Sequence, residues 1–381
     1  MALNTVSSDR LSTNVKNTNF TAAEKQDLTD DILPLATQFG QSKNLIINGA
    51  MQVAQRGTSS TSTGLLIDRV EVEYTGLDEA ATVAQVDVAS GTTPYTLGFR
   101  KAYKITNGNQ TSGAGAGDRF QSFIKLEAQN IANSGWNYTS SSSYITLQFW
   151  IKSSVAQNFY GYLRTKDGTG QRYAFETGSL TADTWTKITK TVPGNSNIVI
   201  DDNNGTGFTI AFLIAYGTDS TDNSRAVNTW AAHSGSTLAP DMASTWLTAG
   251  ASTFDVTGVQ IEVGDSASDF AHEIFHETLS KCQRYYFNFF ASKHNSNGDY
   301  EIEFVPANMR AVPTVTRLAN VMFGGESSTS VSSSAASSES SSVDSSTSST
   351  SSDSSSLSVE SSVDSVASST ASSSAASSES S

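Results

Sequence analysis

Alternating apolar and polar residues dominate the chain between about residues 44 and 264. The stretch ITLQFWIKS, which begins at Ile145, places all its apolar residues except Trp150 on one strand face. FTIAFLIAY, from Phe208, is a denser apolar run, typical of a strand covered on both faces. STFDVTGVQIEV, from Ser252, alternates again, and clusters of Thr, Ser, Gly and Asn separate these runs. Many short strands without intervening amphipathic helices predict an all-β fold, a jelly-roll β-sandwich.

A helical period replaces the strand pattern near the N-terminus. In TAAEKQDLTDDILPLATQF, apolar residues recur at helical spacing, and Glu24 stands three residues after the potential N-cap Thr21. Pro34 should end or kink this helix. The sequence therefore predicts a short N-terminal helix, which either packs on the protein or acts as an attachment or trimerisation segment.

A second change of pattern follows Asp265. HETLSKCQRYY could form one or two helical turns, and GDYEIEFVPANMRAVPTVTRL, from Gly298, predicts a strand, a Pro-marked turn and the start of another strand. The predicted small β module is truncated, because residues 326–381 are almost wholly Ser and are expected to be disordered. The predicted divisions are residues 1–43, an N-terminal attachment segment; 44–268, the jelly roll; 269–325, a hinge and partial C-terminal β module; and 326–381, a low-complexity acidic tail.

The net charge of −14 argues against nucleic acid as a partner. Seven carboxylates of the tail supply half of it, and no Lys or Arg follows Arg317. A single cysteine excludes an intramolecular disulfide framework. The polar first residues lack a signal-peptide core, and no apolar run is long enough for a bilayer, so we expect a soluble protein made in the cytosol without a membrane partner. The glycosylation sequons are then expected to be incidental, at Asn19, Asn109, Asn137 and Asn204.

Several stretches of the chain occur in a defined order. They are NLIINGAMQVAQRGTS, from Asn44, followed by Asp68-Arg69; FQSFIKLEAQNI; ITLQFWIKSS; DTWTKITKTVPG around Trp185; FDVTGVQIEVGDSASDF with LSKCQRYY; and VPANMRAVPTVT. In this order they resemble a family of bacteriophage tail-fibre and virion structural proteins, over roughly residues 44 to 316.

The resemblance implies a sandwich similar to carbohydrate-binding modules. It also implies a virion protein made in the host cytoplasm, often a homotrimer, which contacts other virion proteins and meets the host-cell surface polysaccharide. The chain departs from the family where a C-terminal β module would be completed, since it runs into serine there. Any function of that distal tip is in doubt.

Sugar recognition requires aromatic rings that stack on pyranose faces beside hydrogen-bonding side chains. Trp150 lies on the strand face opposite Phe149, and Trp230 and Trp246 flank loop-like sequence, where we expect exposure. Each ring could instead serve the core. The predicted ligand-binding residues are Trp150, Tyr160, Tyr162, Trp230 and Trp246. A structural Ca²⁺, the one cofactor considered, could draw oxygens from Asp255 or Glu262.

The strongest catalytic motif is HEIFH, at residues 272–276. It matches the H-E-x-x-H pattern in which two histidines, four residues apart on a helix, bind zinc and the glutamate activates water. A third ligand is missing, because the extended motif needs Gly and His where this chain has Leu279 and Cys282. Cys282 could act as a nucleophile beside a histidine, but between Leu279 and Tyr285 we expect it to pack as a small buried apolar residue.

The sequence therefore predicts a non-enzymatic virion protein that attaches to a host glycan. A purely structural virion or decoration protein is the first alternative. A zinc metalloprotease that uses HEIFH is the second, and a secreted adhesin with a mucin-like stalk is the third. In this interpretation the segment from Phe270 to Tyr286 is a packed domain junction.

Overall fold

The structure is a computed structural model, which describes residues 44–293, 300–301, 309–310, 313–317 and 355–361. Internal contacts divide the chain into two units, residues 1–43 and residues 44–381. The helix predicted within residues 21–39 lies outside the described residues and stays a prediction. Nowhere in the described part does a helix combine the length and the apolar character needed to cross a membrane.

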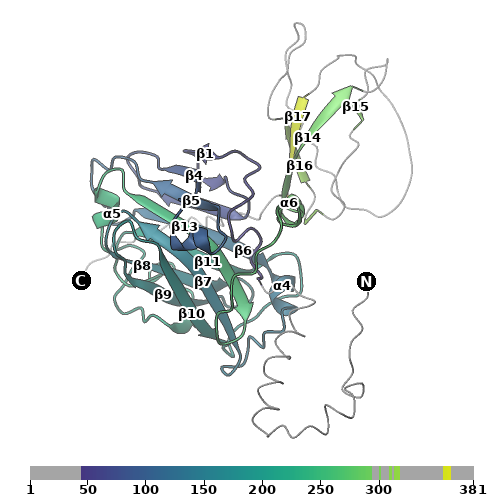
Figure 1. Ribbon diagram of the computed structural model, residues 1–381. Helices are drawn as coiled ribbons and strands as arrows, with labels where there is room; N and C mark the ends of the chain where they lie inside the picture. The colour runs from purple at the N-terminus through teal and green to yellow at the C-terminus, as the bar shows by residue number, and fades with distance from the viewer. Residues whose placement is uncertain (1–43, 294–299, 302–308, 311–312, 318–354, 362–381) are drawn as a thin grey trace, which may run out of the picture. The chain divides into compact units, whose positions relative to one another are not determined.

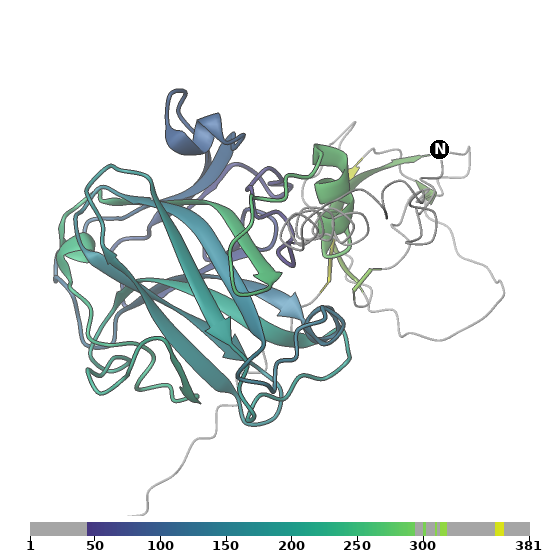
Figure 2. The same ribbon diagram turned by 60° about the horizontal axis from the view of Figure 1, so that its bottom comes forward.

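Two antiparallel sheets form a β-sandwich, whose layers are visible in Figures 1 and 2. The six-stranded sheet contains, in order, β1 (Ser59–Ser60), β4 (Thr82–Asp87), β5 (Lys101–Thr106), β13 (Thr253–Val263), β7 (Tyr144–Ser153) and β10 (Thr186–Pro193). The seven-stranded sheet contains, in order, β12 (Thr229–Ala232), β9 (Gln171–Ser179), β8 (Asn158–Thr165), β11 (Thr206–Tyr216), β6 (Arg119–Glu127), β3 (Val70–Thr75) and β2 (Gly64–Leu65). The prediction of an all-β jelly-roll sandwich is confirmed.

Aromatic rings from facing strands fill the space between the two sheets. Phe149 of β7 packs edge-on against Phe212 of β11 with ring centroids 4.9 Å apart, and Phe159 of β8 packs against Phe254 of β13 at 5.1 Å. All four side chains are buried, and burial of each ring contributes roughly 1.5–3 kcal/mol. Because neighbouring residues of a strand point to opposite faces, the residues between these rings point out of the sandwich.

The described helices are short and lie beside the sheets. One of them, α3, belongs to the blue segment that projects from the sandwich in Figure 2. The helices are α3 (Thr93–Thr96), α4 (Ala128–Ala132), α5 (Thr245–Thr248) and α6 (Phe275–Gln283).

A further four-stranded sheet follows α6. Its strands, in order, are β15 (Tyr300–Glu301), β14 (Tyr286–Lys293), β17 (Ser355–Ser361) and β16 (Pro313–Arg317). The two strands predicted after residue 298 are thus present. β17 differs from the predicted lack of regular structure in the tail: SSLSVES has apolar residues at alternate positions, and β14 and β16 supply its backbone partners. The other tail residues lie outside the described part of the chain.

Two asparagines fix the segment that opens the sandwich. Asn44 donates from its side chain to the Val259 carbonyl (3.0 Å), and its side-chain oxygen accepts from the Ile261 amide (3.1 Å). Asn48 donates to the carbonyls of Val53 and Asp68, each at 2.9 Å. The Asn44 bonds hold the start of this segment against β13, and the Asn48 bonds join it to Val53 and Asp68.

Candidate functional site

The predicted ligand-binding tryptophans occupy very different environments. Trp246 is fully buried in the core, and its indole N–H donates to the Thr253 carbonyl (2.9 Å). The expectation that Trp246 is exposed is therefore wrong, because α5 turns it inward instead of leaving it in a loop. Trp230, on β12, is half-buried against Tyr173, and its N–H donates to the Pro193 carbonyl (2.7 Å). Neither indole N–H is available for a ligand.

Trp150 lines a hollow on the outer face of the six-stranded sheet. The hollow measures ≈ 650 Å³ with its open mouth included. Its aromatic wall consists of Trp150, Phe99, Phe270 and His272, of which the last three pack as one cluster with ring centroids 4.8–5.0 Å apart. His272 is held in this wall by a 2.8 Å hydrogen bond between Nε2 and the Leu97 carbonyl. We call this feature the Trp150 hollow.

Two glycines allow the walls of the Trp150 hollow to approach each other. Gly258 has φ +63° at the irregularity in the β13–β7 pairing, and a Cβ there would lie 2.7 Å from the Phe99 ring. Gly98 has φ +99°, and its Cβ would lie 3.1 Å from the His272 ring. Each position needs glycine for two reasons: its backbone is left-handed, and an aromatic ring leaves too little room for a Cβ atom. The two glycines therefore allow the Phe99 and His272 rings to pack at these positions.

Polar groups stand among the rings of the Trp150 hollow. Lys187, opposite Trp150 in the β10–β7 pair, and Asp269 are exposed and contribute opposite charges. Among the described residues, no partner accepts a hydrogen bond from the Trp150 indole N–H, in contrast to Trp230 and Trp246. An apolar ring with a free donor, flanked by a carboxylate and an ammonium group, suits a flat molecule that carries hydroxyl groups.

Tyr160 and Tyr162 lie on the opposite side of the sandwich, on the outer face of the seven-stranded sheet. The Tyr162 hydroxyl donates to the side-chain oxygen of Gln121 (3.2 Å), which also accepts from the Tyr216 hydroxyl (2.5 Å). The segment between β12 and α5 covers part of this face, since its Leu238 and Met242 pack in the same apolar cluster. Tyr160 is half-buried and Tyr162 is buried. The structure therefore does not join these tyrosines to Trp150 in one site.

Strand register arranges this outer face into rows across the sheet. One row, which we call the basic row, consists of Lys125, Thr209, Arg164 and Arg172. Another, the acidic row, consists of Glu73, Gln121, Leu213, Tyr160 and Glu176. The rows are separated by four residues along β8. Lys125 is paired with Glu71 (2.8 Å), whereas Arg172 lies over the Tyr162 ring at 3.9 Å.

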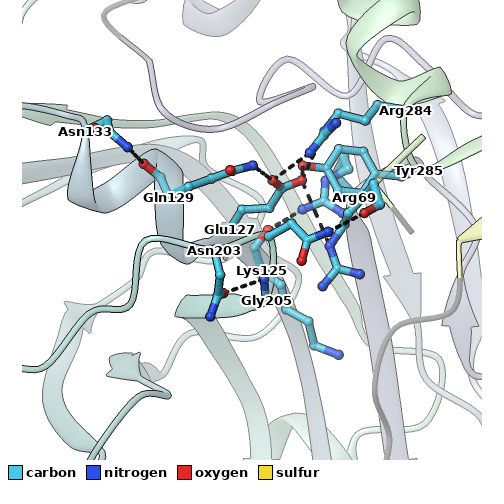
Figure 3. Close-up of polar contacts among 11 residues, drawn as sticks. Arg69, Lys125, Glu127, Gln129, Asn133, Asn203, Gly205, Arg284 and Tyr285 are labelled. Carbon is cyan, nitrogen blue, oxygen red and sulfur yellow. Dashed lines mark hydrogen bonds and ion pairs between the residues drawn. The ribbon is translucent and has the colours of Figure 1, made fainter. Parts of the chain in front are cut away.

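Glu127, at the end of β6, anchors the segment that follows α6 (Figure 3). Its carboxylate, 2% exposed, accepts hydrogen bonds from Arg284 (2.9 Å) and from the Tyr285 hydroxyl (2.5 Å). Gln129 donates to it as well. Burial raises the pKa of Glu127, but the hydrogen bonds from Arg284 and Tyr285 and the charge of Arg284 outweigh burial, so its pKa lies below the ordinary value. The carboxylate is therefore ionised and structural.

The first motif of the family resemblance contacts CQRYY and the strand that follows it. Gln55, in VAQRG, donates to the Tyr286 carbonyl (2.8 Å), and Asn288 donates back to the Gln55 carbonyl (2.7 Å). Arg56 lies 3.6 Å over the Tyr286 ring, and Arg69 lies 3.6 Å over the Tyr285 ring. CQRYY is therefore bound to the start of the sandwich by stacked cations and by hydrogen bonds from side-chain amides to backbone carbonyls.

HEIFH does not form a zinc helix. α6 begins at Phe275, so His272 precedes the helix and cannot share a helix face with His276. Glu273 is bonded to Lys281 and Thr278. No group of three or more His, Cys, Asp or Glu side chains suited to a metal occurs within the described residues. The helical placement of both histidines that the metalloprotease alternative requires is therefore wrong.

The predicted junction is packed, with an inert cysteine at its centre. Cys282 is 0% exposed, and burial raises the pKa of its thiol, which removes the thiolate that a nucleophile needs. Tyr285 and Tyr286 are also buried, and Phe270 packs on Phe99. The packing interpretation is confirmed for Cys282, Tyr285 and Tyr286, whereas Ile274 and Phe275 of the same segment are exposed.

The two calcium candidates are engaged with other groups. Asp255 is 2% exposed and faces Lys152, with a 3.8 Å separation between Oδ1 and Nζ. Glu262 accepts hydrogen bonds from the amide (2.8 Å) and hydroxyl (2.6 Å) of Ser268 and from Gln260 (3.1 Å). Both point outward from β13, but Glu262 is used to fold back the chain after that strand. Calcium binding here stays a prediction.

Comparison with known proteins gives likenesses of fold only. No protein-family model and no curated protein matches the chain. The enzymatically active domain of tailspike protein 4 from bacteriophage CBA120 is 12% identical at TM-score 0.32, covering 58% of this chain and 22% of that one. The N-terminal cellulose-binding domain of Cellulomonas fimi β-1,4-glucanase C is 10% identical at TM-score 0.27, covering 57% and 99%.

A third similar structure is a family 11 carbohydrate-binding module from Clostridium thermocellum, in complex with a β-1,3-1,4-mixed-linked tetrasaccharide. It is 14% identical at TM-score 0.25, and the match covers 55% of this chain and 96% of the module. TM-scores this low carry no argument about function, which therefore rests on the residues described above.

Most residues of the Trp150 hollow could not be predicted from the sequence. Strand alternation alone predicts that Trp150 lies on the face opposite Phe149. Phe99 and Phe270 come from the loop before β5 and from the segment after β13, which are 171 residues apart in the chain. The one local signal is Gly98, which stands directly before Phe99, because Gly258 lies between Thr257 and Val259.

Proposed function

We propose that this chain is a non-enzymatic attachment protein whose sandwich binds a host-surface saccharide in the Trp150 hollow. The observation that carries the proposal is the free indole of Trp150 on the wall of a ≈ 650 Å³ hollow with Lys187 and Asp269 at its edge. A pyranose ring would stack on the indole, and its hydroxyl groups would bond to the charged groups and to the indole N–H.

The wall is preorganised for such a ligand. Phe99 and Phe270 are locked edge to face, and the His272 ring is fixed by the Leu97 carbonyl. Rings that are already ordered lose little conformational entropy on binding, so more of the contact energy appears as affinity. The backbone conformations of Gly98 and Gly258 maintain this arrangement.

We also propose that the chain works on a phage particle, as a tail fibre or appendage, in contact with other virion proteins and as a homotrimer. The ordered motifs from Asn44 to Thr316 support this part of the proposal. Two of these motifs are joined by the hydrogen bond between Gln55 and Tyr286. A virion protein without glycan binding is the second candidate, favoured by the extent to which motif residues are used in packing.

The binding experiment compares three forms of the full chain on a glycan array: wild type, Trp150→Ala and Trp230→Phe. Wild type and Trp230→Phe are expected to retain the same glycans. Trp150→Ala is expected to lose affinity by about tenfold or more, which corresponds to roughly 1.4 kcal/mol. Equal binding by Trp150→Ala and wild type would place the site elsewhere, and no binding by any form favours the purely structural role.

Location on the particle is tested separately. Antibodies raised against the sandwich are expected to label purified virions at the tail in electron micrographs, and crosslinking is expected to yield a trimer. Absence of the protein from purified particles would contradict the virion role and leave the saccharide site to be judged on its own.

A further inference from the structure

Three arginines on the outer face of the seven-stranded sheet have no anionic partner. Arg172 is 1% exposed, yet its Nε and Nη1 have no hydrogen-bond acceptor, and the same holds for Nε of Arg164 and of Arg225. Across the described ranges, no carboxylate lies within ion-pair distance of these guanidinium groups. A buried polar group without a partner is costly, and a buried charge more so.

Backbone contacts bring these groups together. Arg164 and Arg172 are direct neighbours in the β8–β9 pair, and Arg225 donates to the Arg172 carbonyl (2.9 Å). His233 joins them, because its amide donates to the Gly170 carbonyl (2.8 Å), two residues before Arg172. Its Nδ1 is buried and also lacks a partner. We call Arg164, Arg172, Arg225 and His233 the arginine cluster.

The cluster produces a strong local positive potential. Burial, followed by the charges of Arg172, Arg164, Lys166 and Arg225, lowers the pKa of His233 to about 3. The Tyr162 ring, 3.9 Å from the Arg172 guanidinium, offers partial compensation through its π face. Lys166 is exposed at the edge and gives the cluster a cationic entrance.

The negative charge of the whole chain does not cancel this potential. Glu73 and Glu176 of the acidic row are four residues along the strands from the basic row, or about 13 Å at ~3.3 Å per residue. Glu73 still acts on Lys166 at the edge, whereas no carboxylate is among the main charges that shift the pKa of Arg172 or His233. Glu73 and Glu176 also accept hydrogen bonds from Gln121 and Asn158, so they are already engaged.

We propose that the arginine cluster binds an oxyanion group, a carboxylate or sulfate, of an acidic polysaccharide. The half-buried Arg164 would donate to its oxygens, the buried Arg172 would add positive charge beneath it, and Lys166 would attract the anionic chain from solvent. This site lies on the opposite sheet from the Trp150 hollow and does not depend on it.

The test uses affinity electrophoresis of the full chain in gels that contain polygalacturonate, heparin, or neutral dextran. Wild type is expected to be retarded by at least one acidic polymer and not by dextran, and the two acidic gels distinguish carboxylate from sulfate. Arg164→Gln and Lys166→Gln, which change side chains that are not fully buried, should each reduce the retardation several-fold. Lys190→Gln removes a charge from β10, on the other sheet, and should change nothing.

Two further measurements separate the outcomes. Retardation should fall as NaCl rises from 50 to 200 mM, and Trp150→Ala should retain it, so this proposal and the proposed function can fail independently. In NMR titrations, the acidic polymer that binds should raise the pKa of His233. Equal mobility in acidic and neutral gels, or equal losses in Lys190→Gln and Arg164→Gln, would overturn the proposal.

Discussion

Trp150 and Trp246 show how two tryptophans of one sandwich serve different purposes. Trp246 is enclosed by the core, against Phe120 at 5.7 Å, and its N–H is bonded to the chain. Trp150 points away from the core into a solvent-open hollow. The residue type and its sequence neighbours do not distinguish these roles, because both depend on which element covers the ring.

Replacement of Trp246 by alanine tests this distinction. Trp246→Ala should lower the free energy of unfolding by about 3–5 kcal/mol, because it leaves a large cavity in the core. Trp150→Ala should cost far less, since solvent already reaches that ring. Guanidinium unfolding curves of both variants measure the difference, and equal losses would contradict the assignment of Trp150 to an open surface.

Cys282 should be unreactive in the folded protein. Its thiol is fully buried, and burial raises its pKa, so no thiolate forms at neutral pH. A thiol reagent such as dithionitrobenzoate should therefore react only after guanidinium is added, when one thiol per chain is released. Rapid reaction of the native protein would contradict the packing assigned to α6.

At the scale of elements, Glu127 couples β6 to the segment after α6. Arg284 and Tyr285 both bond to its carboxylate, and Arg69 stacks on the Tyr285 ring. Removal of the Glu127 charge would leave the Arg284 guanidinium with a weaker hydrogen-bond acceptor in a largely buried site. The junction is thus a fixed connection to the sandwich, made by one ionised carboxylate.

The lowered pKa of Glu127 makes this connection sensitive to acid. Its stabilising contribution is fully present above the ordinary pKa of 4.5 and is lost as the pH falls through the lower value of the folded state. The difference in stability between wild type and Glu127→Gln should therefore shrink toward zero below that value. Thermal unfolding between pH 3 and pH 7 measures it, and a difference that is independent of pH would contradict this role.

Strand alternation predicts the sandwich well but does not predict contacts between distant elements. ITLQFWIKS gives β7 and the outward direction of Trp150 because that signal is local. The Trp150 hollow needs Phe99 and Phe270, and the Glu127 anchor needs Arg284, which are distant in sequence and are joined only by tertiary packing. The HEIFH motif wrongly suggests a zinc-binding helix for a related reason: the spacing of its histidines does not show that the helix begins only at Phe275.

For the whole molecule, the two proposed sites lie on opposite outer faces of the sandwich. The Trp150 hollow offers rings and a free indole donor on the six-stranded sheet, whereas the arginine cluster offers unpaired cations on the seven-stranded sheet. Such a division would let one chain hold a saccharide by its ring faces and an acidic polymer by its charges. The saccharide site is the central claim, because attachment to a host surface depends on it.

The most direct test is NMR of the chain labelled at its five tryptophan indoles, titrated with an oligosaccharide selected on the glycan array. The Trp150 N–H, which has no partner among the described residues, should shift strongly on binding. The N–H groups of Trp246 and Trp136, which are bonded to the Thr253 and Ser143 carbonyls, should stay unchanged. A bound saccharide that leaves the Trp150 signal unmoved would contradict the account.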